Sequence, residues 1–319
     1  MDLKAKLAEI RDSENLWMIA YVCIITYVFS VALLTVLFLA APLLIQSGNF
    51  LLVGVGAVSY NMVSFFMMCH QLPERSFFLF GMQFPVCARC VGTYLGSTLG
   101  GMLALSPLGA RMPKLLSSKK MLAVMTLPLM VDGVTQTLLY ARESSNSLRL
   151  ATGLMFGFGM LYFFTTKVRE KSLKINCAEE DAFKLAVLVN LLLVAAILAF
   201  GAYTGMGYVS MEEALNIALK DAGGTYQEHS VYYIAPNAVR NIRSDPYLAS
   251  YNDGILKDVS RIRYSEHPYG LWAVALLEEK PAVGPEAVFL PETAGAFFYI
   301  DAMSGEIIGK RVEASQNGG

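Results

Sequence analysis

The feature that most constrains this chain is an almost wholly apolar stretch from Leu16 to Ile45, which contains no charged residue. A helix needs about 20 apolar residues to cross the hydrocarbon of a bilayer, so this stretch predicts a membrane span that is tilted or protrudes. The apolar core of a signal peptide is only about 7–15 residues long, so we expect no cleaved signal here. Composition agrees, since 55% of the 319 residues are hydrophobic and 16% are charged, against about 25% charged residues in soluble domains.

Five further apolar segments have the composition of membrane helices. We expect them at residues 50–68, 87–105, 121–139, 148–164 and 182–202. The fold class predicted from this pattern is mostly α, with a six-span transmembrane helical bundle over residues 16–206. A polar lead at 1–15 precedes the bundle, and a small soluble α+β domain at 208–319 follows it.

The basic connectors predict the orientation of the chain, because short loops rich in lysine and arginine remain in the cytoplasm. In a six-span bundle, connectors 106–120 and 167–181 lie on the same side of the membrane. They hold more lysine and arginine than the connectors on the other side. We therefore place them in the cytoplasm. Both termini, the soluble tail and the loop that carries Cys69 and His70 are then expected outside, so that a site in this loop would lie at the outer membrane face. The protein is expected to be a multi-pass protein of the cell membrane, with the lipid bilayer as its surroundings. Its net charge of -1 gives no reason to expect nucleic acid as a partner.

A stripe of small residues marks the third predicted span. Gly92, Gly96 and Gly100 recur every four positions and so share one helix face. Such faces allow helix backbones to approach closely in lipid. We interpret these glycines as packing residues rather than as a site.

Cysteine and histidine gather in the loop before and at the start of this span. The loop is predicted to be re-entrant or interfacial, between two membrane helices. Thiolate and imidazole are ligands that zinc prefers, and three cysteines with one histidine form a recognised structural set. Cys87 and Cys90 have the spacing that holds one metal from a turn or helix start, whereas the neighbours Cys69 and His70 have diverging side chains. The predicted zinc ligands are Cys69, His70, Cys87 and Cys90.

Two other interpretations of the cysteines remain open. In the first, the protein is a membrane thiol-disulfide oxidoreductase that uses the Cys87/Cys90 pair. A helix N-terminus favours the thiolate, Arg89 would add to this effect, and Cys69 would be the exchanging thiol. In the second, the cysteines are buried structural residues without chemistry. Cys23 and Cys177 stand alone and are read as ordinary residues.

Asp132 is a carboxylate within the fourth predicted span, and Gln136 follows it one turn later. A charged group inside a membrane is costly and marks either a buried partner or a function. The pair therefore predicts an interhelical ion pair, or a site for a substrate, proton or ion in a transporter. The arginines that can pair with Asp132 are Arg75, Arg89, Arg142 and Arg149. Arg75, Arg142 and Arg149 can also receive an anionic or lipid-linked substrate. The sequence names no reaction, so enzymatic activity is left open.

Residues 60–165 resemble a membrane family of unknown function, numbered 2085. The matching residues are Cys69-His70-Gln71, Arg75-Ser76-Phe77, Pro85, Cys87, Arg89-Cys90, Gly92, Tyr94, Gly96, Asp132-Gly133, Gln136, Arg149-Leu150 and Gly153. The resemblance transfers no activity. It implies that one constellation is formed by Cys69, His70, Arg75, Cys87, Arg89, Cys90, Asp132, Gln136 and Arg149.

The tail predicts a helix at 210–224, because Ser210 is a good N-cap, Glu213 completes a capping box and Gly223 ends the helix. Strand-like runs follow at 231–234, 271–276, 287–290 and 296–300, and a turn and return strand at 301–309. The tail resembles a PepSY-like domain in residues 212–218, 272–274 and 299–307, with 240–268 as an insertion. The resemblance implies an extracytoplasmic module that binds a peptide or protein, or regulates, rather than catalyses. His229 and His267 are read as surface residues.

Overall fold

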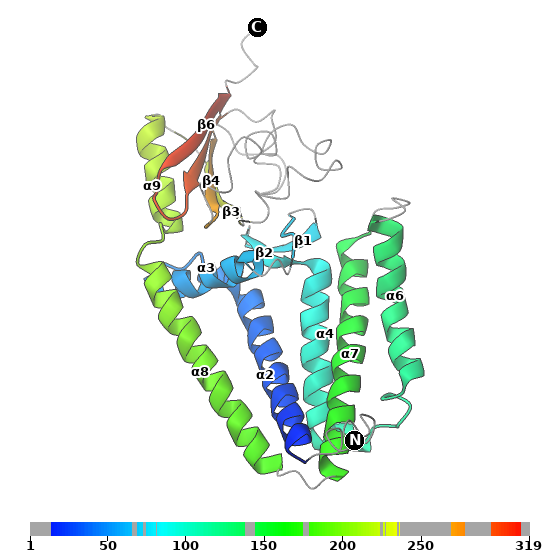
Figure 1. Ribbon diagram of the computed structural model, residues 1–319. Helices are drawn as coiled ribbons and strands as arrows, with labels where there is room; N and C mark the ends of the chain where they lie inside the picture. The colour runs from blue at the N-terminus through cyan, green and yellow to red at the C-terminus, as the bar shows by residue number, and fades with distance from the viewer. Residues whose placement is uncertain are drawn as a thin grey trace, which may run out of the picture. The chain divides into compact units, whose positions relative to one another are not determined.

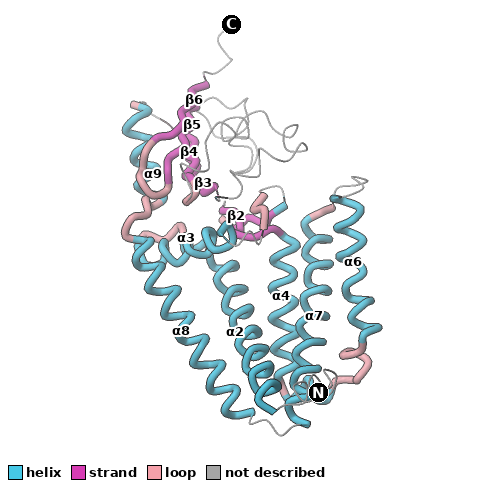
Figure 2. The backbone as a smooth tube through the Cα atoms, in the orientation of Figure 1, coloured by secondary structure: helices cyan, strands magenta, loops and turns pink. Residues whose placement is uncertain are grey.

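The computed structural model describes residues 14–65, 69–72, 75–80, 82–137, 144–174, 179–223, 226, 228–234, 236, 269–277 and 295–313. Within these residues the chain is mostly helical, with two small sheets (Figures 1 and 2). The mostly α class is therefore confirmed. The chain divides into two compact units, the first made of residues 1–36 and 88–196 and the second of residues 37–87 and 197–319. Each unit is described by itself.

Six helices of the described residues lie at the predicted apolar segments, α9 lies at the helix predicted in the tail, and the short α5 lies in the predicted basic connector 106–120. Their bounds are α2 Glu14–Leu44, α3 Phe50–Phe65, α4 Ala88–Leu105, α5 Pro107–Arg111, α6 Lys119–Thr137, α7 Asn146–Lys174, α8 Glu179–Gly205 and α9 Met211–Ala222. The main difference from prediction is α7, which continues through the first part of the expected basic connector at 167–181 and ends at Lys174.

Three helices in the described part of the chain are long and apolar enough to cross a membrane: Leu16–Leu44 of α2, α7 and α8. The predicted count of six spans is not supported. α3 has 16 residues, and at about 1.5 Å per residue it falls short of a hydrocarbon layer of about 30 Å. α4 carries Arg89 among glycines and hydroxyl residues, and α6 begins with two lysines and contains Asp132, so both are less apolar than a typical span.

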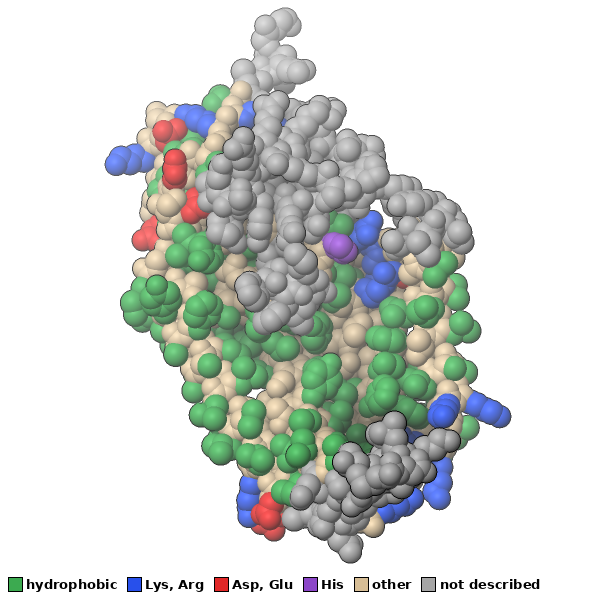
Figure 3. Space-filling view, in the orientation of Figure 1, with side chains coloured by type: hydrophobic (Ala, Val, Ile, Leu, Met, Phe, Trp, Pro, Cys, Tyr) green, Lys and Arg blue, Asp and Glu red, His purple; other side chains and the backbone are tan. Residues whose placement is uncertain are grey.

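The exposed face of α8 is apolar. Figure 3 shows hydrophobic side chains along this helix and charged side chains at its N-terminal end. Leu188, Leu191, Leu192 and Phe200 are among its exposed large side chains, whereas Glu179, Glu180 and Asp181 occupy the first turn. An apolar surface of this length is unusual on a soluble protein and is expected in contact with lipid.

The glycine stripe of α4 packs against α7 in the first unit, where α4, α7 and α6 lie side by side (Figure 1). A Cβ at Gly92 would lie 2.2 Å from the Leu150 carbonyl oxygen, and one at Gly96 would lie 2.2 Å from that of Leu154. A Cβ at Gly153 of α7 would likewise lie 2.2 Å from the Arg89 carbonyl oxygen. The predicted packing role of the stripe is confirmed. Because residue numbers rise together along both helices, α4 and α7 are parallel.

The second unit contains the C-terminal sheet. Its antiparallel strands are β3 Glu228–Ile234, β4 Leu271–Leu277, β5 Gly295–Asp301 and β6 Ile307–Glu313, in the order β3-β4-β5-β6. The strands predicted near 231, 271, 296 and 307 are confirmed, and the one predicted at 287–290 lies outside the described residues. α9 begins with the predicted Ser210–Glu213 capping box and ends at Gly223 with φ 65°. The proposed insertion at 240–268 also lies outside the described residues.

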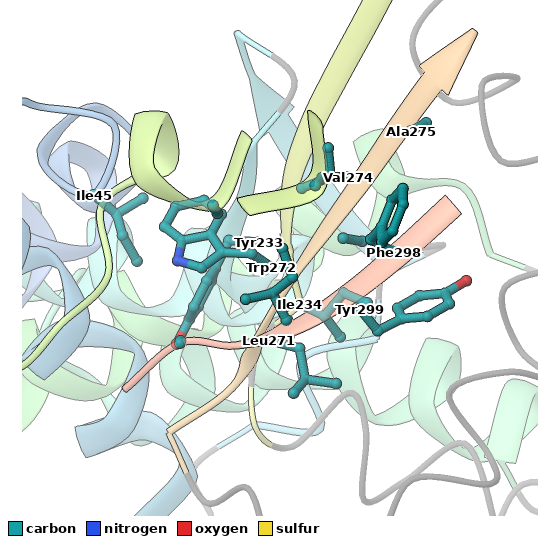
Figure 4. Packing of buried hydrophobic residues seen from close by; sticks show 14 of the residues in the cluster. Ile45, Tyr233, Ile234, Leu271, Trp272, Val274, Ala275, Phe298 and Tyr299 are labelled. Atoms are coloured by element: carbon teal, nitrogen blue, oxygen red, sulfur yellow. The ribbon is translucent and has the colours of Figure 1, made fainter. Parts of the chain in front are cut away.

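The sheet shares one hydrophobic core with the helices of its unit. Tyr233 of β3 and Trp272 of β4 lie beside each other in this core (Figure 4), with ring centroids 5.3 Å apart. Other members of the same cluster come from the end of α2, from α3 and from the segment before α4: Ala41, Ile45, Val53, Ala57, Tyr60 and Met82. The C-terminal sheet is thus packed against the segment that leads to the cysteine cluster.

Candidate metal centre

A β-hairpin carries the cysteine cluster. Strands β1 Ser76–Leu79 and β2 Met82–Cys87 are antiparallel, and Phe80 adopts a left-handed φ of 51° at the turn between them. The predicted re-entrant or interfacial loop therefore contains a two-stranded sheet that the sequence interpretation missed. β2 runs directly into α4, so Cys87 ends the strand and Cys90 lies in the first turn of the helix.

Three sulfur atoms converge at this junction. The Sγ atoms of Cys69, Cys87 and Cys90 all lie within 4.8 Å of one another. Cys90 lies near Cys87 because it follows that residue by three positions, in the first turn of α4. Zinc–sulfur bonds of about 2.3 Å in a tetrahedral site put sulfurs about 3.8 Å apart. The three side chains are therefore close to the spacing that one zinc ion requires.

The Cys69 sulfur accepts two backbone hydrogen bonds. The Cys87 N–H donates to it at 3.1 Å and the Gln71 N–H at 3.5 Å. Hydrogen bonds to a charged form favour that form, and the thiolate is the form that binds metals and attacks disulfides. Cys69 is also buried, so these donors replace water as partners of the sulfur.

His70 is exposed and does not belong to the group formed by the three sulfurs. Of the four predicted ligands, the structure brings the three cysteines together. A role for His70 as a fourth ligand stays a prediction. Cys23 is exposed on α2, as expected for an ordinary residue, and Cys177 lies outside the described residues.

Two glutamines hold the loop. Gln71 Nε2 donates to the carbonyl oxygens of Tyr60 at 3.1 Å and Pro85 at 2.9 Å. Gln83 Nε2 donates to the Gln71 carbonyl oxygen at 2.6 Å. Both glutamines are almost completely buried, with 0% and 1% exposure. Sequence interpretation assigned no role to Gln83, although an amide in the otherwise apolar run of β2 is a signal that could have identified it.

The predicted intramembrane carboxylate is ion-paired. Arg89 Nη2 donates to Asp132 Oδ2 at 2.5 Å and to Gln136 Oε1 at 3.0 Å. Asp132 is 2% exposed, whereas the Arg89 side chain is 26% exposed. Arg89, one of the predicted partners, therefore pairs with Asp132 and links α4 to α6 within the first unit.

Two of the other predicted arginines lie within the described residues. Arg149 is buried near the start of α7, and its Nη1 donates to Asn146 Oδ1 at 2.8 Å. Arg75 is half-buried immediately before β1, and its backbone N–H donates to the Leu72 carbonyl oxygen. Arg142 lies outside the described residues. From the predicted constellation, the structure brings three cysteines together in one cluster, and Arg89, Asp132 and Gln136 together in another.

Known proteins resemble this central part of the chain. A family model described as "Predicted membrane protein (DUF2085)" matches residues 69–163. An uncharacterized protein of Methanothermobacter thermautotrophicus is 42% identical over 95 residues, which cover 29% of this chain and 80% of that protein. This chain belongs to the DUF2085 family. An uncharacterized protein of Methanocaldococcus jannaschii is 40% identical over 98 residues, or 30% of this chain, and the chain spans 61% of that relative's length. No solved structure matches the chain.

The DUF2085 region contains every site residue described above. It begins at Cys69 and includes the hairpin, the cysteine cluster and the Arg89–Asp132–Gln136 group. The C-terminal sheet lies outside this region. The membership identifies the protein as a predicted membrane protein, which agrees with the three candidate spans.

Proposed function

We propose that this protein is an integral membrane protein that binds one zinc-type metal ion through Cys69, Cys87 and Cys90. The observation that carries the proposal is the convergence of the three sulfur atoms within 4.8 Å. Three thiolates form a soft ligand set, which selects zinc or other soft ions over magnesium or calcium. The two N–H groups that point at the Cys69 sulfur support the same conclusion, because they stabilise a thiolate.

The fourth coordination position decides what the metal does. With His70 as the fourth ligand, the set would be closed, and the ion would hold the hairpin to the start of α4 as a structural crosslink. With the position open, a bound ion would supply Lewis acidity toward an anionic or lipid-linked substrate. In either case the chain contributes three thiolates, and Gln71 and Gln83 hold the loop that carries the first of them.

Metal analysis of the purified full-length protein tests this proposal. We expect about one zinc ion per chain, and less than about a tenth of that in Cys87→Ser, since two thiolates hold zinc far more weakly. Cys23→Ser is the matched control, because Cys23 is exposed on α2, and it should keep the full zinc content. A metal-free preparation with native helix content and thermal stability would refute the proposal.

A second candidate function is thiol-disulfide exchange. The observation that favours it is the position of Cys87 immediately before α4 and of Cys90 in its first turn, where the helix dipole favours thiolates. A disulfide partner would exchange with the pair, which would become oxidised as the partner is reduced. Trapping of thiols in native membranes should then reveal a Cys87–Cys90 disulfide, whereas a fully reduced pair under all growth conditions would exclude the relay.

A transporter that uses Asp132 is less well supported. Asp132 is buried and paired with Arg89, which is the arrangement expected of an interhelical ion pair. We therefore assign Asp132 and Gln136 to the stability of the bundle.

For the C-terminal part, we propose an extracytoplasmic PepSY-like module that binds a peptide or protein, or regulates. Support comes from the capped helix α9 followed by an antiparallel sheet. A C-terminal tag on the full-length protein should be cleaved by protease added to intact cells. Protection of the tag until the cells are lysed would reverse the assignment.

A further inference from the structure

Tyr232 of β3 is linked to the cysteine loop by side-chain hydrogen bonds within the second unit. Its hydroxyl donates to Gln83 Oε1 at 3.3 Å. Gln83 lies on β2, the strand that ends at Cys87. This contact joins the C-terminal sheet to the hairpin through one phenol and one buried amide.

Ser76 determines how the Gln83 amide is oriented. The Ser76 hydroxyl donates its single proton to the Leu72 carbonyl oxygen at 2.7 Å, so it accepts from Gln83 Nε2 at 3.0 Å. The same nitrogen donates to the Gln71 carbonyl oxygen. Gln83 Oε1 therefore faces Tyr232, and loss of the Tyr232 hydroxyl would remove a hydrogen bond from a buried acceptor, which is costly.

Gln71 carries the link to the metal ligand. Its carbonyl oxygen accepts from Gln83, and its own N–H donates to the Cys69 sulfur. The residue adopts a left-handed φ of 54°, a conformation that non-glycine residues seldom adopt unless their surroundings fix it. The carbonyl belongs to the peptide group after Gln71 and the N–H to the peptide group before it, and the Gln71 Cα joins the two. A change in the position of Gln83 would therefore act through the backbone of Gln71 on the N–H that donates to the Cys69 sulfur.

Aromatic packing reinforces the hydrogen bonds. The Phe78 ring of β1 stacks on the Tyr232 ring with centroids 6.1 Å apart and an interplanar angle of 24°. Tyr60 of α3 packs edge-on against Tyr233 at 4.9 Å, and its hydroxyl donates to the Gln83 carbonyl oxygen. Tyr232 thus contacts the hairpin directly, whereas Tyr233 contacts Tyr60 of α3. Of these two tyrosines, only Tyr232 has a hydroxyl that donates to the Gln83 side chain in the described residues.

We infer that the C-terminal sheet sets the metal affinity of the cysteine site through Tyr232, Gln83 and Gln71. The inference rests on the metal binding proposed above and names its regulation. Tyr232 acts through Gln83 and is a positioning residue. Because linkage is reciprocal, a metal ion at the cysteines must stabilise β3 to the same extent that β3 strengthens metal binding. The strand β3, which would control the metal affinity, lies outside the DUF2085 region.

Cobalt titration of the full-length protein in detergent measures the coupling, because thiolate-to-cobalt absorption reports the ligand set. Tyr232→Phe removes one oxygen atom and should weaken cobalt affinity about 3- to 10-fold, the range of one buried hydrogen bond, with unchanged stoichiometry. Tyr233→Phe is the matched control on the same strand. Its hydroxyl bonds to the Tyr208 hydroxyl and the Tyr269 carbonyl oxygen, so this variant should lose thermal stability and keep its cobalt affinity.

Hydrogen exchange supplies a second readout that a merely structural role of Tyr232 would not change. Metal should slow amide exchange in β3 of the wild type and of Tyr233→Phe, and do so much less in Tyr232→Phe. Equal cobalt affinity in wild type and Tyr232→Phe, or equal weakening by both variants, would overturn the inference, as would β3 exchange that is indifferent to metal. A wild-type protein that binds neither cobalt nor zinc would overturn the metal proposal itself, and the coupling with it.

Discussion

The α4–α7 helix pair and the contact between the hairpin and the C-terminal sheet are assembled by different means. α4 and α7 meet through glycines, so that carbonyl oxygens of one helix occupy the space where the other would carry a Cβ. The hairpin and sheet meet through large side chains, with stacked rings and a buried amide. The first contact depends on the absence of side chains and the second on the identity of particular side chains. An added methyl group should therefore destabilise the helix pair, whereas the loss of side-chain atoms should weaken the contact between hairpin and sheet.

The largest effect is expected for Gly96→Ala in the helix pair. The added methyl would lie 2.2 Å from the Leu154 carbonyl oxygen, and backbone cannot move aside as a side chain can. We expect a loss of about 3 kcal/mol in unfolding free energy, measured by thermal unfolding in detergent. Gly133→Ala on α6 is the control, because nothing lies within 4 Å of the place its added methyl would occupy, and it should be neutral or slightly stabilising. If Gly96→Ala kept the unfolding free energy of the wild type, close backbone packing would not be what holds α4 to α7.

Asp132→Asn should have the next largest effect. It leaves the Arg89 guanidinium without its carboxylate partner, and about 2 kcal/mol of stability should be lost, since the 26% exposure of Arg89 allows partial solvation. Zinc content should not change. A double-mutant cycle with Arg89→Gln isolates the pair energy. If Asp132→Asn retained full stability and abolished a measured ion flux, the transporter interpretation would replace the structural one.

Alkaline pH should affect the second unit through its buried tyrosines. Burial raises the pKa of Tyr233 and of Tyr208 above the usual 10. In the unfolded chain both lose their protons near pH 10, so the folded state binds more protons above that pH and its stability must fall. The expected slope is about 1.4 kcal/mol per pH unit for each tyrosine. Tyr233→Phe should make the fall in stability shallower above pH 10, and identical slopes would show that Tyr233 ionises equally in both states.

The smallest effect is expected at the start of α9. Ser210→Ala removes the hydroxyl that accepts from the Glu213 N–H at 3.2 Å, which should cost about 1 kcal/mol. Ser210→Thr keeps a capping hydroxyl and should retain most of the stability. Chemical denaturation of the full-length protein would measure both variants. If Ser210→Ala lost as much unfolding free energy as Gly96→Ala, the stability of the second unit would depend on α9 more than the loss of one capping hydrogen bond explains.

Local patterns were sufficient to predict the long helices, α9 and the strands of the C-terminal sheet. The apolar runs placed the long helices, the four-residue glycine spacing identified the face of α4 that packs on α7, and Ser210 with Glu213 and Gly223 bounded α9. The predicted number of six spans is not supported, since α3, α4 and α6 are helices at the predicted positions but do not reach the length and hydropathy of a membrane span in the described residues. Helix formation depends on local periodicity, whereas spanning also depends on length and charge.

The cysteine site was predicted only in part. Its thiols were evident from their clustering, and Arg89 was one of four arginines that could pair with Asp132. The contact between Arg89 and Asp132 became evident only from the α4–α6 geometry, because four arginines of equal charge cannot be ranked from sequence. The hairpin strands, and the roles of Gln71 and Gln83 between them, were not anticipated.

By itself the sequence determined a helical membrane protein of the DUF2085 family with three cysteines close together along the chain and a capped, stranded tail. The composition and periodicity of a short segment determine whether it forms a helix or strand, so these elements can be predicted from the sequence alone. Only the tertiary structure decided that three sulfurs share one point and that Tyr232 reaches Gln83 across 149 residues of sequence. Such pairings depend on which surfaces meet after folding, and a hydrogen bond between distant residues leaves no periodic mark in the sequence.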